Sequence, residues 1–172
     1  MARIVMSWSK CKIEVGKTGA NDAMAASLAN LGVINDKSTT LTTEDGDTLE
    51  AKATGGVVVA YEEGEHRYVI STRIKEPDFT TEASIIKATA GQDELTVKSN
   101  IVADDYSVKV TPKNVGAIGI KARRTHMTWK PGSSEEEGHY VDVTFTILEC
   151  ADGELYKKFR VKATDWASGS GS

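Results

Sequence analysis

The sequence predicts a mainly β protein: an antiparallel β-sandwich or barrel-like domain with one or two short flanking helices and a long polar hairpin arm. Most segments alternate apolar and polar residues, which is the pattern of strands with one buried face. Turn sequences rich in Gly, Asp and Glu separate these segments. The 172 residues contain no internal repeat. We therefore expect residues 1–166 to form a single domain around one core.

Composition and charge narrow the class of protein. Apolar residues make up 40% and charged residues 27% of the chain, as in ordinary globular proteins. No window approaches the ~18 apolar residues of a membrane-spanning helix, so no membrane anchor is expected. The apolar run at the start is too short for a secretory signal. Residues 167–172 resemble a flexible Gly/Ser linker or tag remnant.

The first half of the chain predicts three groups of strands. Residues 10–15 form the first. Residues 38–43 and 47–54 flank Glu44-Asp45-Gly46 and predict a Thr-rich hairpin, which we call the predicted arm (residues 38–56). It has too few apolar residues for a core of its own, so it should be dispensable for folding. Residues 57–61 and 66–75 flank a second turn and predict a second hairpin.

Two short helices are predicted between these strands. Asn21 is a suitable N-cap, and Gly32 a suitable stop, for the alanine-rich segment 23–31. Thr80 or Thr81 could cap a second helix over residues 82–88.

The second half shows the clearest alternation, over residues 140–148. Residues 155–162 alternate again after an Asp-Gly turn, which predicts a hairpin. Residues 119–130 form a plausible strand whose inner face is not evident, and residues 131–138 predict a polar loop. Four core positions of the hairpin are expected to be mostly buried: Val143, Phe145, Phe159 and Val161.

The chain offers no recognisable catalytic or cofactor site. His66, His126 and His139 lie in separate predicted strands without metal-ligand spacing, and are expected to be ordinary strand residues. Nucleophile-elbow and phosphate-binding glycine motifs are missing. The sequence therefore predicts a non-enzymatic protein with no catalytic residue, no cofactor and no metal.

Cysteine usage and charge bear on compartment and partners. Cys11 and Cys150 either stay reduced or form a disulfide, which requires Cα atoms within about 7 Å. The acidic run at residues 135–137 lacks calcium-loop spacing and is expected to be a solvated loop. A net charge of -4 with scattered Lys and Arg disfavours a DNA-gripping surface.

Several segments resemble the tail-tube proteins of phages and prophages of Bacteroides-type bacteria. The string STTLTTEDGDTLEAKATGG at residues 38–56 resembles their hairpin arm. Ser-Trp-Ser-Lys at residues 7–10, the segment 106–112 and the closing strands up to Trp166 are also similar. The chain departs from the family pattern at residues 19–32 and 131–138. Tube proteins of contractile tails and type VI secretion are similar to this family.

The resemblance implies a structural protein of the virion tail, made in the bacterial host cytoplasm. Six copies would close into a ring, and rings would stack into a tube through which DNA passes without specific binding. Its partners would be copies of itself and other tail proteins. The resemblance makes the predicted arm the inter-subunit element, with these residues: Thr39, Thr40, Leu41, Thr42, Thr43, Glu44, Asp45, Asp47 and Leu49.

A β-sandwich adhesin or carbohydrate-binding module is the alternative. Its aromatic contacts would come from five residues that do not cluster in the sequence: Trp8, Trp129, Trp166, Tyr61 and Tyr140.

Overall fold

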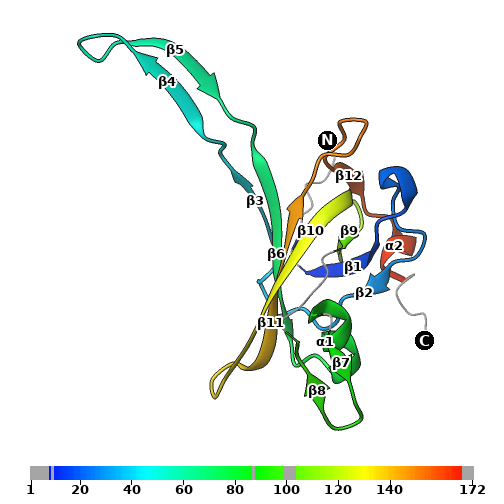
Figure 1. Ribbon diagram of the computed structural model, residues 1–172. Coiled ribbons are helices and arrows are strands. Elements are labelled where there is room, and N and C mark those ends of the chain that lie inside the picture. Colours follow the sequence, from blue (N-terminus) through cyan, green and yellow to red (C-terminus); the bar gives the residue numbers. More distant parts are fainter. Residues whose placement is uncertain (1–7, 9, 87, 99–103, 168–172) are drawn as a thin grey trace.

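The computed structural model describes residues 8, 10–86, 88–98 and 104–167 and confirms the mainly β fold class. Its main sheet has eight antiparallel strands in the order β2-β1-β9-β10-β11-β6-β3, with β12 also paired to β10. Figure 1 shows a curved body from which two hairpins extend. The strands of the main sheet are β1 (Cys11–Lys17), β2 (Ala29–Asn30), β3 (Thr40–Glu44), β6 (Arg67–Lys75), β9 (Asp105–Pro112), β10 (Ile118–Ser134), β11 (Gly138–Ile147) and β12 (Lys157–Arg160).

The segment that follows β2 joins the two sides of this sheet. Leu31 donates its N–H to the Ile13 carbonyl of β1 at 2.9 Å. Four residues further on, Asn35 donates to the Arg73 carbonyl of β6 at 2.8 Å, and Lys75 donates to the Val33 carbonyl. Because one segment satisfies the edges of both β1 and β6, the sheet closes into a barrel-like shape.

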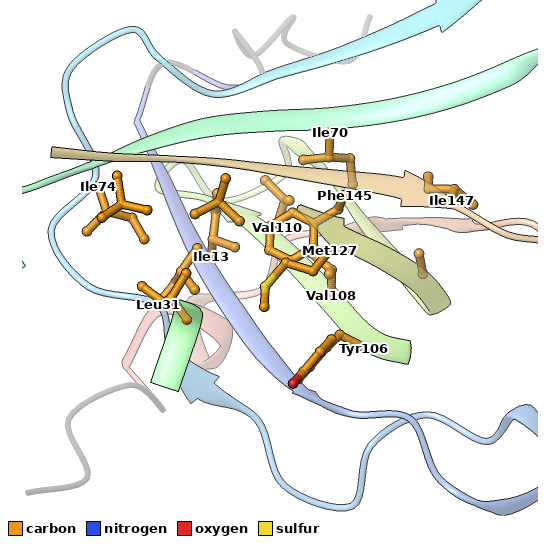
Figure 2. Close-up of a cluster of buried hydrophobic side chains, with 14 of the residues drawn as sticks. Ile13, Leu31, Ile70, Ile74, Tyr106, Val108, Val110, Met127, Phe145 and Ile147 are labelled. Atoms are coloured by element: carbon orange, nitrogen blue, oxygen red, sulfur yellow. The ribbon is translucent and has the colours of Figure 1, made fainter. Parts of the chain in front are cut away.

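The interior of the barrel holds the core. Side chains from β1, β6, β9, β10 and β11 converge there (Figure 2). Phe145 of β11 is fully buried at the centre, and Val143 and Val161 are also buried, as predicted. Phe159 is only half-buried: it lies beside the Lys109 ammonium, 5.2 Å from the ring centroid. Phe159 is therefore the least buried of the four residues expected to be mostly buried.

A bulge in β10 explains why its inner face could not be predicted. Ile120 and Ala122 are buried before the bulge, and Thr125 and Met127 are buried after it. The pairing with β9 shifts between Ala122 and Thr125. The buried side chains therefore lie at even-numbered positions before the bulge and at odd-numbered positions after it.

Two predicted connections next to β10 are wrong. Residues 131–134 continue β10 and pair with β11, so the polar loop is reduced to residues 135–137. Pro131 is tolerated there because β9 pairs with β10 only as far as His126, which leaves that edge of β10 open. Strands β11 and β12 do not form a hairpin, since both pair with β10.

One of the two predicted helices is present. Helix α1 (Phe79–Ile86) is capped by Asp78 rather than by Thr80 or Thr81. The Thr81 N–H donates to the Asp78 carboxylate at 2.7 Å, and this hydrogen bond lowers the pKa of Asp78. A short hairpin of β7 (Thr89–Ala90) and β8 (Leu95–Thr96) follows, and α2 (Ala163–Ala167) ends the described chain.

The predicted helix over residues 23–31 does not form. Only a single 3-10 turn is present, η1 (Ala20–Asp22). Asn21 and Asp22 both have a φ of 56°, outside the right-handed helical region. The following segment packs against β1, and a side chain on Gly16 would collide with the Ser27 carbonyl. Tertiary packing therefore overrides the helix propensity of the alanines.

Candidate assembly surfaces

The most prominent surface feature is one long hairpin rather than the two short ones predicted. Strand β3 pairs with β6, and β4 (Thr48–Lys52) pairs with β5 (Val58–Glu63). The register continues across the junction, because Glu44 pairs with Arg67 and, four residues further on each leg, Thr48 pairs with Glu63. Residues 44–46 and 62–65 are therefore parts of the two legs, not turns.

The true turn lies at residues 53–57. Ala53 and Val57 are joined by a backbone hydrogen bond of 2.8 Å, and Gly55 and Gly56 have φ angles of 96° and 82°. Glycine suits this turn because positive φ is unstrained without a Cβ. We call residues 45–65 the distal hairpin. From Asp45 to the turn it extends about 30 Å at ~3.3 Å per residue, away from the body (Figure 1).

Two glycines allow the legs to approach closely where the distal hairpin leaves the body. A Cβ on Gly46 would lie 2.5 Å from the backbone of Gly64, and a Cβ on Gly64 would lie 2.6 Å from the Asp47 carbonyl oxygen. Backbone atoms cannot yield as a flexible side chain can, so this junction requires glycine on both legs.

The distal hairpin exposes apolar side chains between Leu49 and Tyr61. Every residue of β4 and β5 is exposed, and these two strands pair only with each other in the described structure. Leu49 is 68% exposed and Tyr61 is 58% exposed, and Val57, Val58 and Val59 are also exposed. Strand β5, which lies outside the predicted arm, supplies most of this apolar surface.

The distal hairpin also accounts for the net negative charge of the chain. Residues 45–65 contain six carboxylates and one lysine, a net charge of -5, whereas the whole chain has -4. The rest of the chain therefore has a net charge of +1.

The structure divides the residues of the predicted arm between body and distal hairpin. Strand β3 belongs to the main sheet, where Leu41 packs against the core and Glu44 forms an ion pair with Arg67. Thr39, just before β3, shares a hydrogen bond of 3.1 Å with Thr72. The three other residues in this part, Thr40, Thr42 and Thr43, lie in β3. Only three of the predicted residues lie in the distal hairpin: Asp45, Asp47 and Leu49.

A groove of about 1090 Å³ lies on the body, and we call it the tryptophan groove. Trp8 and Trp166 line it together with Val33, which is 72% exposed. The charged lining consists of three lysines and one aspartate: Lys10, Lys12, Lys37 and Asp36. Residues from both ends of the chain and from the closing segment thus meet here, which no local sequence pattern could indicate.

The lysines of the groove differ in their surroundings. Lys12 is buried and donates to the Asp165 backbone carbonyl at 3.0 Å, with Glu14 at 3.4 Å and the Trp166 ring centroid at 5.6 Å. Lys10 and Lys37 are exposed. Within the described part of the chain, neither has a carboxylate within 4.0 Å.

A cluster of Ser133, His139 and Glu82 escaped the sequence analysis. The His139 ring bonds through Nδ1 to Ser133 Oγ at 2.8 Å and through Nε2 to the Glu82 carboxylate at 2.9 Å. Ser133 and His139 face each other across β10 and β11, and Glu82 is only 3% exposed on α1. The cluster compensates a buried carboxylate and thereby ties α1 to the β10–β11 hairpin.

The two cysteines and the potential metal ligands do not form a site in the described structure. Cys11 and Cys150 are free thiols, and burial raises the pKa of Cys11 to about 11. Among the described residues, no group of three or more His, Cys, Asp or Glu could hold a metal ion. None of the helices in that part of the chain is long and apolar enough to cross a membrane.

No protein-family model matches the sequence, and no curated protein matches it either. The resemblance to tail-tube proteins therefore depends only on the sequence segments that suggested it.

Proposed function

We propose that the protein is a structural subunit that assembles with copies of itself through the distal hairpin, as rings stacked into a phage tail tube. The observation that carries the proposal is a two-stranded hairpin that exposes Leu49, Val59 and Tyr61 and, among the described residues, pairs with no other strand. An isolated two-stranded hairpin is at best marginally stable in water, so a neighbouring subunit is the natural source of the missing contacts.

Shortening the hairpin tests this proposal. Residues 47–63 are replaced by a short Gly-Ser turn, which keeps β3 and β6 in the sheet. We expect the intact chain to form rings or tubes in electron micrographs, and the shortened chain to remain a monomer with an unchanged unfolding midpoint. A full-length variant with Leu49→Ser, Val59→Ser and Tyr61→Ser is the matched control for length. An intact chain that stays monomeric when concentrated, or a shortened chain that still assembles, would contradict the proposal.

The conduit part of the proposal requires a wall that DNA does not bind, so we expect an acidic or neutral lumen. The lysines are less scattered than the sequence suggested, because the register places Lys109, Lys121 and Lys157 in one row on adjacent strands. Carboxylates accompany this row: Lys157 lies 3.0 Å from Glu154, and Lys109 lies 3.9 Å from Asp165. In the proposed tube this row faces away from the lumen.

Titration with duplex DNA at low and physiological ionic strength checks the conduit. We expect no measurable binding. Micromolar binding that weakens steeply with salt would show that the lysine row grips phosphates, and the conduit function would be lost.

A carbohydrate-binding module is the second candidate function, because the structure brings Trp8 and Trp166 to one groove. Tryptophan rings that line a groove offer amphipathic surfaces for ligands with an apolar face. Calorimetric titration with a panel of oligosaccharides tests it. Binding that Trp166→Ala abolishes would favour this function over assembly.

A further inference from the structure

We propose that the tryptophan groove is the receptor for the distal hairpin of a neighbouring copy. The inference rests on the proposed function of self-assembly and adds the receiving surface to it. Three observations carry it: apolar complementarity, charge complementarity, and the direction in which the distal hairpin extends.

The apolar match lies between the groove, with two half-buried tryptophans and the exposed Val33, and exposed side chains of the distal hairpin. The groove presents Trp8, Trp166 and Val33, and the distal hairpin presents Leu49 and Tyr61. Aromatic side chains in concave sites are typical anchors of protein interfaces. The volume of the tryptophan groove, about 1090 Å³, accommodates several side chains rather than the whole hairpin. Leu49 and Tyr61 lie on opposite faces of the hairpin, because Leu49 pairs with Glu62 and Tyr61 pairs with Glu50. The face that carries Tyr61 would therefore enter the groove, and the face that carries Leu49 would be left to contact another part of the neighbouring subunit.

The charge match is between a hairpin of net charge -5 and a groove with three lysines and one aspartate. Lys10 and Lys37 are the exposed members, and neither is neutralised by a carboxylate of the described chain. Opposite charges of this kind accelerate encounter and disfavour wrong partners more than they raise affinity. A second copy of the chain supplies the required acidic apolar segment.

The direction of the hairpin makes the contact intermolecular. The distal hairpin points away from the body in Figure 1, so its tip reaches a groove on another copy. Such a head-to-tail contact leaves one groove and one hairpin unused at the two ends of any open assembly. It therefore continues until the assembly closes into a ring or grows as a stack.

Photo-crosslinking locates the receiving surface. A benzophenone amino acid replaces Tyr61, and the labelled chain is mixed with isotopically heavy wild-type chain before irradiation. We expect crosslinks from the distal hairpin to heavy peptides that contain residues 30–37 or Trp166. Benzophenone at Val115, which is also exposed but lies outside the groove, is the matched control. Crosslinks that map elsewhere, or only within one chain, would overturn the inference.

Charge reversal measures the contribution of the groove. The double variant Lys10→Glu, Lys37→Glu is expected to raise the protein concentration at which half of the chains are assembled, on the order of tenfold. Adding Glu62→Lys and Glu63→Lys to the same chain should restore assembly. Lys130→Glu with Lys158→Glu is the control with equal net charge, and it should have a smaller effect. Equal weakening by both pairs, or no rescue, would contradict docking in the groove.

The two proposals fail in different ways. If shortening the hairpin abolishes assembly while groove charge reversal does not, self-assembly stands and the groove is not the receptor. If the shortened chain assembles normally, the proposed function itself is wrong. If an oligosaccharide binds the groove without affecting assembly, the groove is a ligand site and the inference is overturned.

Discussion

Strand β11 in the barrel and strand β5 in the distal hairpin have similar side chains but different surroundings. Both are rich in β-branched and aromatic residues, which favour strands. In β11, Val141, Val143 and Phe145 are fully buried, whereas Val59 and Tyr61 of β5 are more than half exposed. Sequence pattern thus indicates a strand in both regions, but it does not show whether the chain itself covers the apolar residues.

The comparison has an energetic meaning. Full burial of a large apolar side chain is worth roughly 1.5–3 kcal/mol. The barrel obtains this free energy on folding. The distal hairpin does not obtain this free energy in the single chain, because its apolar side chains stay exposed. Its net charge of -5 also opposes close contact between two such hairpins. A partner surface should therefore be apolar and basic rather than a second distal hairpin.

The largest expected effect separates the two regions by the same kind of substitution. Phe145→Ala should lower the free energy of unfolding by about 3–5 kcal/mol, because it leaves a cavity in a fully buried site. Tyr61→Ala should change it by less than about 0.5 kcal/mol, because that ring is exposed. Urea denaturation of monomeric protein measures both. A loss below about 1 kcal/mol for Phe145→Ala would mean that the barrel core is misassigned.

A smaller effect distinguishes the two parts of the predicted arm. Leu41 in β3 is half-buried against the core, so Leu41→Ala should lower the free energy of unfolding by about 1–2 kcal/mol. Leu49→Ala should leave stability within about 0.5 kcal/mol and weaken assembly instead. Thermal unfolding and sedimentation velocity give the two quantities. Similar stability losses for both variants would show that the distal hairpin folds as part of the core.

Sequence reasoning located most strands but not their partners. The Glu-Asp-Gly and Glu-Gly-Glu segments carry the composition of turns, yet they lie on opposite legs of one hairpin. The pair Gly55-Gly56 was the better turn signal, since positive φ at adjacent residues favours glycine. Pairing is decided by register along the whole hairpin, which a local turn pattern does not contain.

The candidate sites were predictable to different degrees. Glu82 precedes Ile85 and Ile86 by three and four residues, so helical periodicity was a signal, not used in the prediction, for its position on the buried face of α1. Its partner His139 could not be predicted, because β11 lies beside α1 only in the folded chain. The same holds for Trp8 and Trp166 in the tryptophan groove, which are more than 150 residues apart.

The last prediction concerns the junction between the two regions and has the smallest effect on global stability. Gly46→Ala places a methyl group 2.5 Å from the Gly64 backbone, so the legs must separate where the distal hairpin leaves the body. β3 and β6 remain paired below this point, and we therefore expect the free energy of unfolding to change by less than about 0.5 kcal/mol.

Assembly should nevertheless weaken, because the distal hairpin is redirected while its exposed side chains are unchanged. Hydrogen exchange at the Gly64 amide, which bonds to the Asp47 carbonyl at 2.9 Å, reports the local opening. Gly91→Ala, in the connection between β7 and β8, is the control for a glycine outside the junction. If Gly46→Ala accelerates Gly64 exchange without any loss of assembly, the hairpin docks flexibly and its direction does not determine the contact. If it destabilises the whole domain, the junction belongs to the barrel and the boundary between the two regions lies further out along the hairpin.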